Sequence, residues 1–215
     1  MDASERIARG VRSKRPILIK CCFVLKVLPP ELRDLSVRRL LIFVVLGLLF
    51  AAPGEVLNQI LSRHNLPAFR STMVSYSVLL LIGFFVEKGI SAVFRKSRAR
   101  LAYYLLFGLL GLMVEWFLLG NAPVLEPFQI VTQPGMFTYW GTMLLAPCLM
   151  MEPDFAELKK SFARFFASFS LLYLLVALAV PRDKGGIFFA FIIFAGGTTA
   201  LNYFYVKYFR ELANG

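Results

Sequence analysis

Six long apolar stretches alternate with short polar segments along the chain. They cover residues 40–61, 72–93, 101–120, 136–151, 162–180 and 187–206. About 20 predominantly apolar residues make a helix long enough to cross the roughly 30 Å hydrocarbon layer of a membrane. The pattern therefore predicts an all-α membrane protein, a bundle of about six transmembrane helices. The first stretch contains Pro53-Gly54-Glu55, which predicts a kink or a broken helix there.

The segment that precedes the first stretch differs from the rest of the chain. It is rich in Lys and Arg, and only residues 16–28 within it are mostly apolar. This run is too short to cross a membrane and contains Lys20 and Lys26, so it predicts a cytoplasmic N-terminal interfacial helix or, equally, a helix packed against the bundle. We expect no cleavable signal peptide, because no small-residue cleavage pattern follows the run. The chain thus divides into a basic cytoplasmic segment (1–39), a polytopic transmembrane domain (40–210) and a short cytoplasmic tail (211–215).

The composition excludes an ordinary soluble domain. Hydrophobic residues make up 58% of the 215 positions and charged residues 17%, whereas soluble domains have about 45–50% apolar and about 25% charged residues. The same apolar content excludes an intrinsically disordered chain. Lipid is therefore the expected solvent for most of the chain.

The net charge of +11 is distributed unevenly along the chain. If both termini are cytoplasmic, 20 of the 24 Lys and Arg residues fall in or beside cytoplasmic segments and four fall outside. This is the excess that cytoplasmic loops of membrane proteins show, and it predicts N- and C-termini in the cytoplasm and a plasma (inner) membrane location. Anionic membrane lipid is the expected partner of the basic segments, and no nucleic acid is expected.

Tyrosine and tryptophan residues lie near the predicted span boundaries. Tyr103 and Tyr104 open the third stretch, and Trp116 lies near its outer end. Tyr139 and Trp140 lie near the start of the fourth stretch. Because Tyr and Trp favour the interface between water and lipid, we expect these five residues at the membrane surface.

Polar residues inside the predicted spans are the candidates for function. A charged side chain at the centre of a span costs about 2.5–3.5 kcal/mol, so such residues usually face the protein interior and are often functional. Glu55 and Glu115 lie at comparable depths, roughly 22 and 21 Å from the cytoplasmic ends of their spans at about 1.5 Å per residue. Asn58 lies farther out on the first span, and Gln133 precedes the fourth. We expect these four residues to line an outward-facing polar cavity that binds an unidentified small-molecule substrate.

Structural explanations stay open for both acids. Glu115 lies about five residues from the end of its span, where a carboxyl group can reach the membrane surface. Glu55 follows Pro53 and Gly54, and a kink there would place it near a local helix N-terminus, where the backbone dipole favours negative charge. A broken helix that lines a binding site would have the same sequence.

A second, weaker set of acidic residues lies at the cytoplasmic ends of the second and fourth stretches. Its members are Glu87, Glu152, Asp154 and Glu157. Most of them are expected to be solvated, with Asp154 or Glu157 paired with a nearby lysine at little gain in stability.

Two further patterns predict contacts between helices. Gly108 and Gly111 form one of several small-residue pairs at the spacing that allows close approach of helices, most simply within this chain. Asn202 lies in the sixth stretch and is expected to hydrogen-bond a neighbouring helix rather than a ligand.

Several classes of cofactor site are excluded by the residues that the chain lacks. His64 is the only histidine, and the three cysteines contain no CxxC pair, so a multi-histidine metal centre, a bis-histidine haem and a zinc site cannot be built. The sequence also has no glycine-rich phosphate loop, no GxSxG and no HExxH motif. We expect no metal and no cofactor.

The preferred functional hypothesis is a small polytopic membrane transporter or a substrate-binding membrane subunit. One alternative is a non-catalytic subunit or assembly factor of a membrane complex, with other membrane-protein subunits as partners. A further alternative is an intramembrane enzyme that acts on a lipid or a lipid-linked substrate, with Glu115 as general acid or base and Glu55 as its partner.

Overall fold

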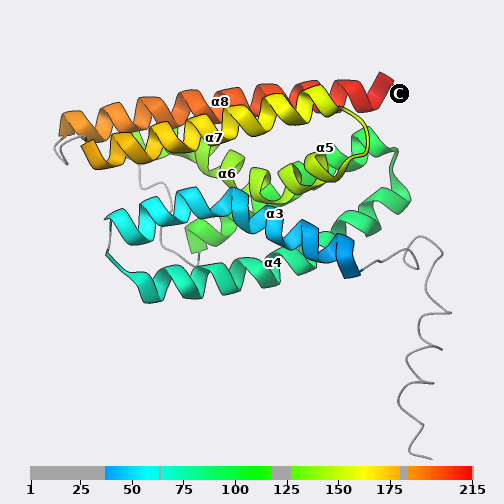
Figure 1. The fold of residues 1–215 in the computed structure, drawn as a ribbon, viewed down its shortest axis with the longest axis horizontal. Helices are drawn as coiled ribbons and strands as arrows, with labels where there is room; N and C mark the ends of the chain where they lie inside the picture. The colour runs from blue at the N-terminus through cyan, green and yellow to red at the C-terminus, as the bar shows by residue number, and fades with distance from the viewer. Residues whose placement is uncertain (1–36, 63, 118–126, 180–183, 215) are drawn as a thin grey trace, which may run out of the picture. The chain divides into compact units, whose positions relative to one another are not determined.

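A computed structural model describes residues 37–62, 64–117, 127–179 and 184–214. Within these ranges the regular structure is helical throughout, as the apolar pattern predicts. The elements are α3 (Val37–Glu55), the π-helix η2 (Val56–Ser62), α4 (Leu66–Val93), α5 (Lys96–Phe117), α6 (Pro127–Met151), α7 (Ala156–Ala179) and α8 (Lys184–Asn214) (Figure 1). The predicted interfacial helix at 16–28 lies outside the described residues.

Four helical segments in the described part of the chain are long and apolar enough to cross a membrane. They are Val37–Leu61, Leu66–Val93, Lys96–Phe117 and Ala156–Ala179, and they correspond to the first, second, third and fifth predicted stretches. Large apolar side chains on them are exposed, for example Leu41 at 62%, Leu109 at 56% and Leu178 at 66%. Such extended apolar surface is suited to lipid rather than water. These features identify a membrane protein.

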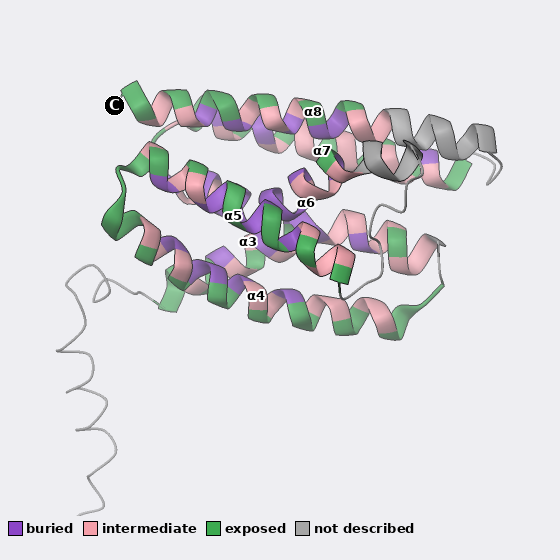
Figure 2. Cartoon of the chain, turned by 180° about the vertical axis from the view of Figure 1, so that it is seen from behind, coloured by how far each residue is buried: buried purple, intermediate pink, exposed green. Residues whose placement is uncertain are grey.

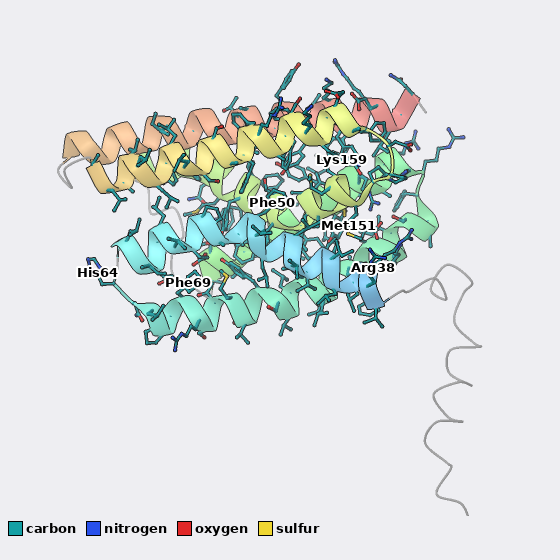
Figure 3. All side chains as sticks on the ribbon, viewed as in Figure 1. Arg38, Phe50, His64, Phe69, Met151 and Lys159 are labelled. Atoms are coloured by element: carbon teal, nitrogen blue, oxygen red, sulfur yellow. The ribbon has the colours of Figure 1, made fainter. Side chains whose placement is uncertain are left out.

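Successive helices run in alternating directions (Figure 1). The N-terminal end of α3, the α4–α5 and α6–α7 connections and the C-terminal end of α8 therefore lie at one end of the bundle. We name it the basic end, because Arg38, Lys96 and Lys159 lie there. His64 and Phe69 lie at the opposite end, which we name the distal end (Figure 3).

Helix α6 is the centre of the bundle. It packs against α3, α5 and α8, and every residue from Trp140 to Leu149 is buried. Buried positions are concentrated on α6 and on the inner faces of its neighbours (Figure 2). Helices α5 and α6 lie between the pair α3 and α4 and the pair α7 and α8 (Figure 1), so polar groups on α6 can reach both pairs.

Close packing of α5 on α6 depends on the predicted small residues. A Cβ atom added at Gly108 would overlap the ring of Phe137, and one added at Gly111 would overlap Trp140. The Gly108–Gly111 pair is therefore a contact between helices of the same chain, as expected. It lets the backbone of α5 approach the large aromatic side chains of α6.

Asn202 joins three helices. Its Oδ1 accepts a hydrogen bond from the Tyr104 hydroxyl at 2.5 Å, and its Nδ2 donates to Thr138 Oγ1 at 2.8 Å. These bonds connect α8 to α5 and α6. The prediction that Asn202 hydrogen-bonds its neighbours is confirmed.

The predicted interruption in the first span is a change of helix type. α3 continues through Pro53 and Gly54 to Glu55, and the π-helix η2 begins at the next residue. Proline removes one intrahelical donor, and π-helical turns accommodate such a disturbance while keeping the helix continuous. Glu55 is thus the last residue before the helix widens, so its backbone belongs to a continuous helix.

Candidate functional site

Glu55 is a buried carboxyl group between three helices. Its residue is only 6% exposed. Oε1 accepts a hydrogen bond from the Tyr76 hydroxyl on α4 at 2.6 Å, and the Tyr139 hydroxyl on α6 lies 3.3 Å from the same atom. Among the described residues, the second oxygen, Oε2, is buried without a hydrogen-bond partner. One oxygen of the carboxyl group is therefore hydrogen-bonded by protein side chains, and the other is buried with no hydrogen-bond partner among the described residues.

The glycine before Glu55 makes room for one of these tyrosines. A Cβ atom at Gly54 would lie 2.7 Å from the ring of Tyr139. Any other side chain would push Tyr139 away from α3. The Pro53-Gly54-Glu55 sequence therefore places a carboxyl group and the space for its hydroxyl partner side by side on one turn of helix.

Tyr139 has two acceptors within reach and one proton to donate. Its hydroxyl lies 3.1 Å from the Ala51 carbonyl oxygen and 3.3 Å from Glu55 Oε1. A hydroxyl group donates one hydrogen bond at a time. The charge on Glu55 therefore decides which of the two acceptors on α3 the Tyr139 proton favours.

Glu115 is held by the residue next to Tyr139. Trp140 Nε1 donates to Glu115 Oε1 at 3.1 Å, which joins α6 to α5. The Trp140 ring also packs edge-on against Tyr76, with centroids 5.5 Å apart and planes at 74°. We name Tyr76, Tyr139 and Trp140 the aromatic bridge. It brings Glu55 and Glu115 together, because consecutive residues of α6 contact the two acids.

The other two predicted site residues lie farther out. Gln133 Oε1 accepts a hydrogen bond from Trp116 Nε1 at 2.7 Å. Gln133 lies six residues before Tyr139 on α6, about 9 Å along the helix at about 1.5 Å per residue. Asn58 is exposed on η2 and does not join the aromatic bridge. The structure thus groups Glu55 with Glu115, and it places Gln133 and Asn58 toward the distal end.

Tyr139 and Trp140 of the bridge, together with Tyr103, Tyr104 and Trp116, were expected at the membrane surface, but three of these five side chains are buried within the bundle. Trp140 is 5% exposed and Tyr103 and Tyr104 are 0% and 6% exposed. Tyr139 and Trp140 lie away from the start of α6 because this helix begins at Pro127, nine residues before the predicted stretch. Both residues therefore lie near mid-helix. The apolar pattern missed the first nine residues of α6 because this part of the helix contains polar residues.

A small apolar cavity adjoins Tyr139. It has a volume of about 50 Å³ and lies between α3, α6, α7 and α8, with Phe50, Gly54, Tyr139 and Phe166 among its lining residues. A cavity of about 10–15 Å³ already holds one water molecule, so this space admits a small apolar group. Tyr139 thus lines this cavity and also lies within 3.3 Å of Glu55 Oε1.

A second cluster of charged residues lies at the basic end. Glu87 and Glu152 are 6% and 5% exposed, and they form ion pairs with Arg100 and Lys96 respectively. The expectation that most of this acidic set is solvated is therefore wrong for these two residues. It is right for Asp154 and Glu157, which are exposed. Glu87 and Glu152 can be buried because the basic start of α5 lies between the ends of α4 and α6, and a nearby cation offsets the cost of desolvation.

Among the described residues, no group of three or more His, Cys, Asp or Glu side chains is placed to hold a metal ion. No known protein family, curated protein or solved structure matches the chain.

Proposed function

We propose that this chain is a small polytopic membrane transporter, or the substrate-binding membrane subunit of one, and that Glu55 is its substrate-binding carboxyl group. The observation that carries this proposal is the half-satisfied carboxyl inside the bundle. Two tyrosine hydroxyls serve Oε1, and Oε2 is buried without a partner among the described residues. A polar group that is costly to bury and incompletely paired is favoured where a ligand completes it.

The chemistry of this site fits a small cationic solute. An ionised carboxylate only accepts hydrogen bonds, so a ligand at Oε2 has to donate one or carry positive charge. A primary ammonium group does both. The apolar cavity has Gly54 and Tyr139 in its wall, next to Glu55 in sequence and in space respectively, and a small alkyl group fits its volume. Among simple probes, methylammonium combines these two properties.

In this proposal the substrate reaches Glu55 from the distal end, along α6. It would meet the exposed Asn58 on η2 first and Gln133, which is hydrogen-bonded to Trp116, next. Glu115, which is hydrogen-bonded to Trp140, would be the last residue before Glu55. Carboxylate and amide oxygens along this path would replace part of the hydration shell of a cation. These four predicted residues therefore act in sequence rather than as one ring of ligands.

We also propose six membrane spans with both termini in the cytoplasm of a cell whose plasma (inner) membrane holds the protein. α6 and α8 have 25 and 31 residues, which is about 37 and 46 Å at about 1.5 Å per residue, enough to cross a roughly 30 Å layer. The distribution of Lys and Arg supports a cytoplasmic basic end, with 20 of 24 on that side in this threading. The path to Glu55 then opens outward.

Tyr139 would couple occupancy of the site to helix α3. When Glu55 is ionised and empty, its negative charge attracts the Tyr139 proton. When a cation neutralises Glu55, the Ala51 carbonyl oxygen becomes the better acceptor. Ala51 lies one turn before the junction of α3 and η2. The exchange of acceptors by the Tyr139 hydroxyl would therefore give the empty and occupied states different contacts near that junction. A ligand shifts a protein between two conformations only if its contacts differ between them.

Intrinsic fluorescence tests the proposal, because Trp116 and Trp140 are the only tryptophans of the chain and both lie on the path. The chain in phosphatidylcholine nanodiscs is titrated with methylammonium, choline or sodium. We expect a saturable change with methylammonium that Glu55→Gln abolishes and that Glu157→Gln, a change at an exposed residue, leaves intact. The proposal fails if the wild-type chain shows no saturable change with any of the three, or if Glu55→Gln responds as wild type does.

The alternative of an intramembrane enzyme rests on the same pair of acids. Glu55 and Glu115 contact one aromatic bridge, and two carboxyl groups in different environments can serve as general acid and base. This alternative requires a bound lipid or lipid-linked molecule to be converted to product only when both acids are present. Mass spectrometry of lipids incubated with the purified chain distinguishes it from transport.

A further inference from the structure

A cavity of about 160 Å³ lies at the basic end, between the ends of α3, α4, α5 and α6. Its charged lining residues are Arg39, Lys88, Lys96, Arg100, Glu87 and Glu152. The volume is more than ten times the roughly 10–15 Å³ that one water molecule needs. Because Arg39 and Lys96 are exposed, the cavity reaches the surface of the bundle. Met151, another lining residue, marks its position in Figure 3.

The walls of this cavity carry more positive than negative charge. Four cationic side chains face two carboxylates. Both carboxylates are engaged, since Glu87 pairs with Arg100 and also accepts from Ser91 Oγ at 2.7 Å, and Glu152 pairs with Lys96. The charged lining residues therefore carry a net charge of two positive units.

Two of the cations have capacity for a further contact. Arg100 Nε is buried and has no hydrogen-bond partner among the described residues. Lys88 Nζ lies 4.0 Å from Glu87 Oε2 and 5.8 Å above the Phe84 ring, so its ion pair is long and its ammonium group keeps donors to spare. An anion in the cavity would meet a guanidinium group and an ammonium group from neighbouring helices.

We infer that this cavity binds a phosphate group. Guanidinium and ammonium groups that converge on one space are the donors that phosphate oxygens accept best. The apolar wall residues Phe43, Phe84 and Met151 suit the carbon chain of a phosphate ester rather than a bare ion. The bound phosphate closes the basic end by linking the ends of four helices.

This site is independent of the proposed function at Glu55. Arg39 and Glu55 lie sixteen residues apart on α3, about 24 Å at about 1.5 Å per residue. With the basic end at the surface of the membrane, the phosphate can come from the headgroup of an anionic lipid or from a soluble phosphate ester. The chemistry is the same for both sources, and the sources differ in whether the acyl chains are needed.

The test measures thermal unfolding of the full chain in detergent with four probes. They are phosphatidylglycerol, diacylglycerol, glycerol 3-phosphate and glycerol. A ligand that binds the folded state raises the unfolding temperature in a concentration-dependent way. An increase with phosphatidylglycerol but not with glycerol 3-phosphate assigns the site to a lipid headgroup, and an increase with both shows that the phosphate group suffices. No increase with either, or the same increase with diacylglycerol as with phosphatidylglycerol, overturns the inference.

Single substitutions of lining residues test whether the probes bind in this cavity. Arg39→Gln and Lys88→Gln each remove one charged contact and should weaken binding about tenfold. Arg38→Gln is the matched control, because Arg38 is the neighbouring residue on α3, is exposed and does not line the cavity. Lys88→Gln keeps the test valid if Arg39→Gln disturbs folding. If Arg38→Gln weakens binding as much as the two cavity variants do, the attraction is a general effect of charge and the site does not exist.

Discussion

Tyr139 and Glu55 lie 84 positions apart in the sequence, yet the Tyr139 hydroxyl lies 3.3 Å from Glu55 Oε1. The contact joins α6 to α3 at the point where α3 changes into a π-helix. The next residue, Trp140, joins α6 to Glu115 on α5. Two adjacent residues of the central helix thus hold the two acids that the proposed function depends on.

Tyr76→Phe should destabilise the bundle. The change removes the 2.6 Å hydrogen bond to Glu55 Oε1 and leaves a buried carboxyl group with less support. Loss of a partner by a buried polar group costs about 1–3 kcal/mol. Thermal or denaturant unfolding in detergent measures the loss, with Tyr203→Phe as control because Tyr203 is 68% exposed. Equal stability of the two variants would show that Tyr76 does not support Glu55.

Gly111→Ala should also lower stability, and Gly89→Ala should not. A Cβ atom at Gly111 would overlap Trp140, whereas nothing lies within 4 Å of a Cβ atom at Gly89. Overpacking costs about 1–3 kcal/mol, and replacement of an exposed helical glycine by alanine stabilises by about 0.5–1 kcal/mol. The two unfolding midpoints should therefore move in opposite directions. Because Trp140 is displaced only by the first change, its fluorescence should shift in Gly111→Ala alone.

Arg100→Gln should be among the most destabilising single changes at the basic end. It leaves the Glu87 carboxylate, whose side chain is 7% exposed, without its closest cation. Removal of one partner from a buried ion pair costs about 3–5 kcal/mol. Arg98→Gln is the control, since Arg98 lies on the same turn of α5 and is exposed. A second variant, Arg100→Gln with Glu87→Gln, should recover much of the loss, and a failure to recover would mean that the ion pair is not its cause.

The proposed orientation can be tested by cysteine labelling. In a background without Cys21, Cys22 and Cys148, single cysteines are placed at His64 and Arg98, two exposed positions at opposite ends of the bundle. A membrane-impermeant reagent should label position 64 in intact cells and position 98 only after the membrane is opened. The reverse pattern would place the basic end outside the cell. Labelling of both positions in intact cells would show that α4, which lies between them, does not cross the membrane.

The sequence predicted the helices well because each contains a long apolar core. The second stretch and α4 both end at Val93. The prediction was poorest where a helix extends into polar sequence, as at the start of α5, where Lys96 to Arg100 are helical but carry three basic residues. Hydropathy detects the apolar part of a helix and misses polar turns that extend the same helix at either end.

The candidate site was only partly accessible to sequence reasoning. Counting residues placed Glu55 and Glu115 at one depth, and the structure attaches both to neighbouring residues of α6. Depth along a helix does not determine which face points inward, so Tyr76 and Tyr139 were not recognised as partners of Glu55. Glu87 and Glu152 were expected in water because the sequence does not show which residues of other helices lie beside them. Their cationic partners, Arg100 and Lys96, belong to α5.

Uptake of radiolabelled methylammonium into sealed vesicles that contain the purified chain tests whether Glu55 is the carboxyl group that binds a cationic substrate. We expect saturable uptake by the wild-type chain and by Glu157→Gln. Glu115→Gln and Glu55→Gln should reach the same protein level in the vesicles, with uptake reduced at least about tenfold by the first and abolished by the second. Uptake by Glu55→Gln equal to that of the wild-type chain, or no uptake above protein-free vesicles by any variant, would contradict the claim.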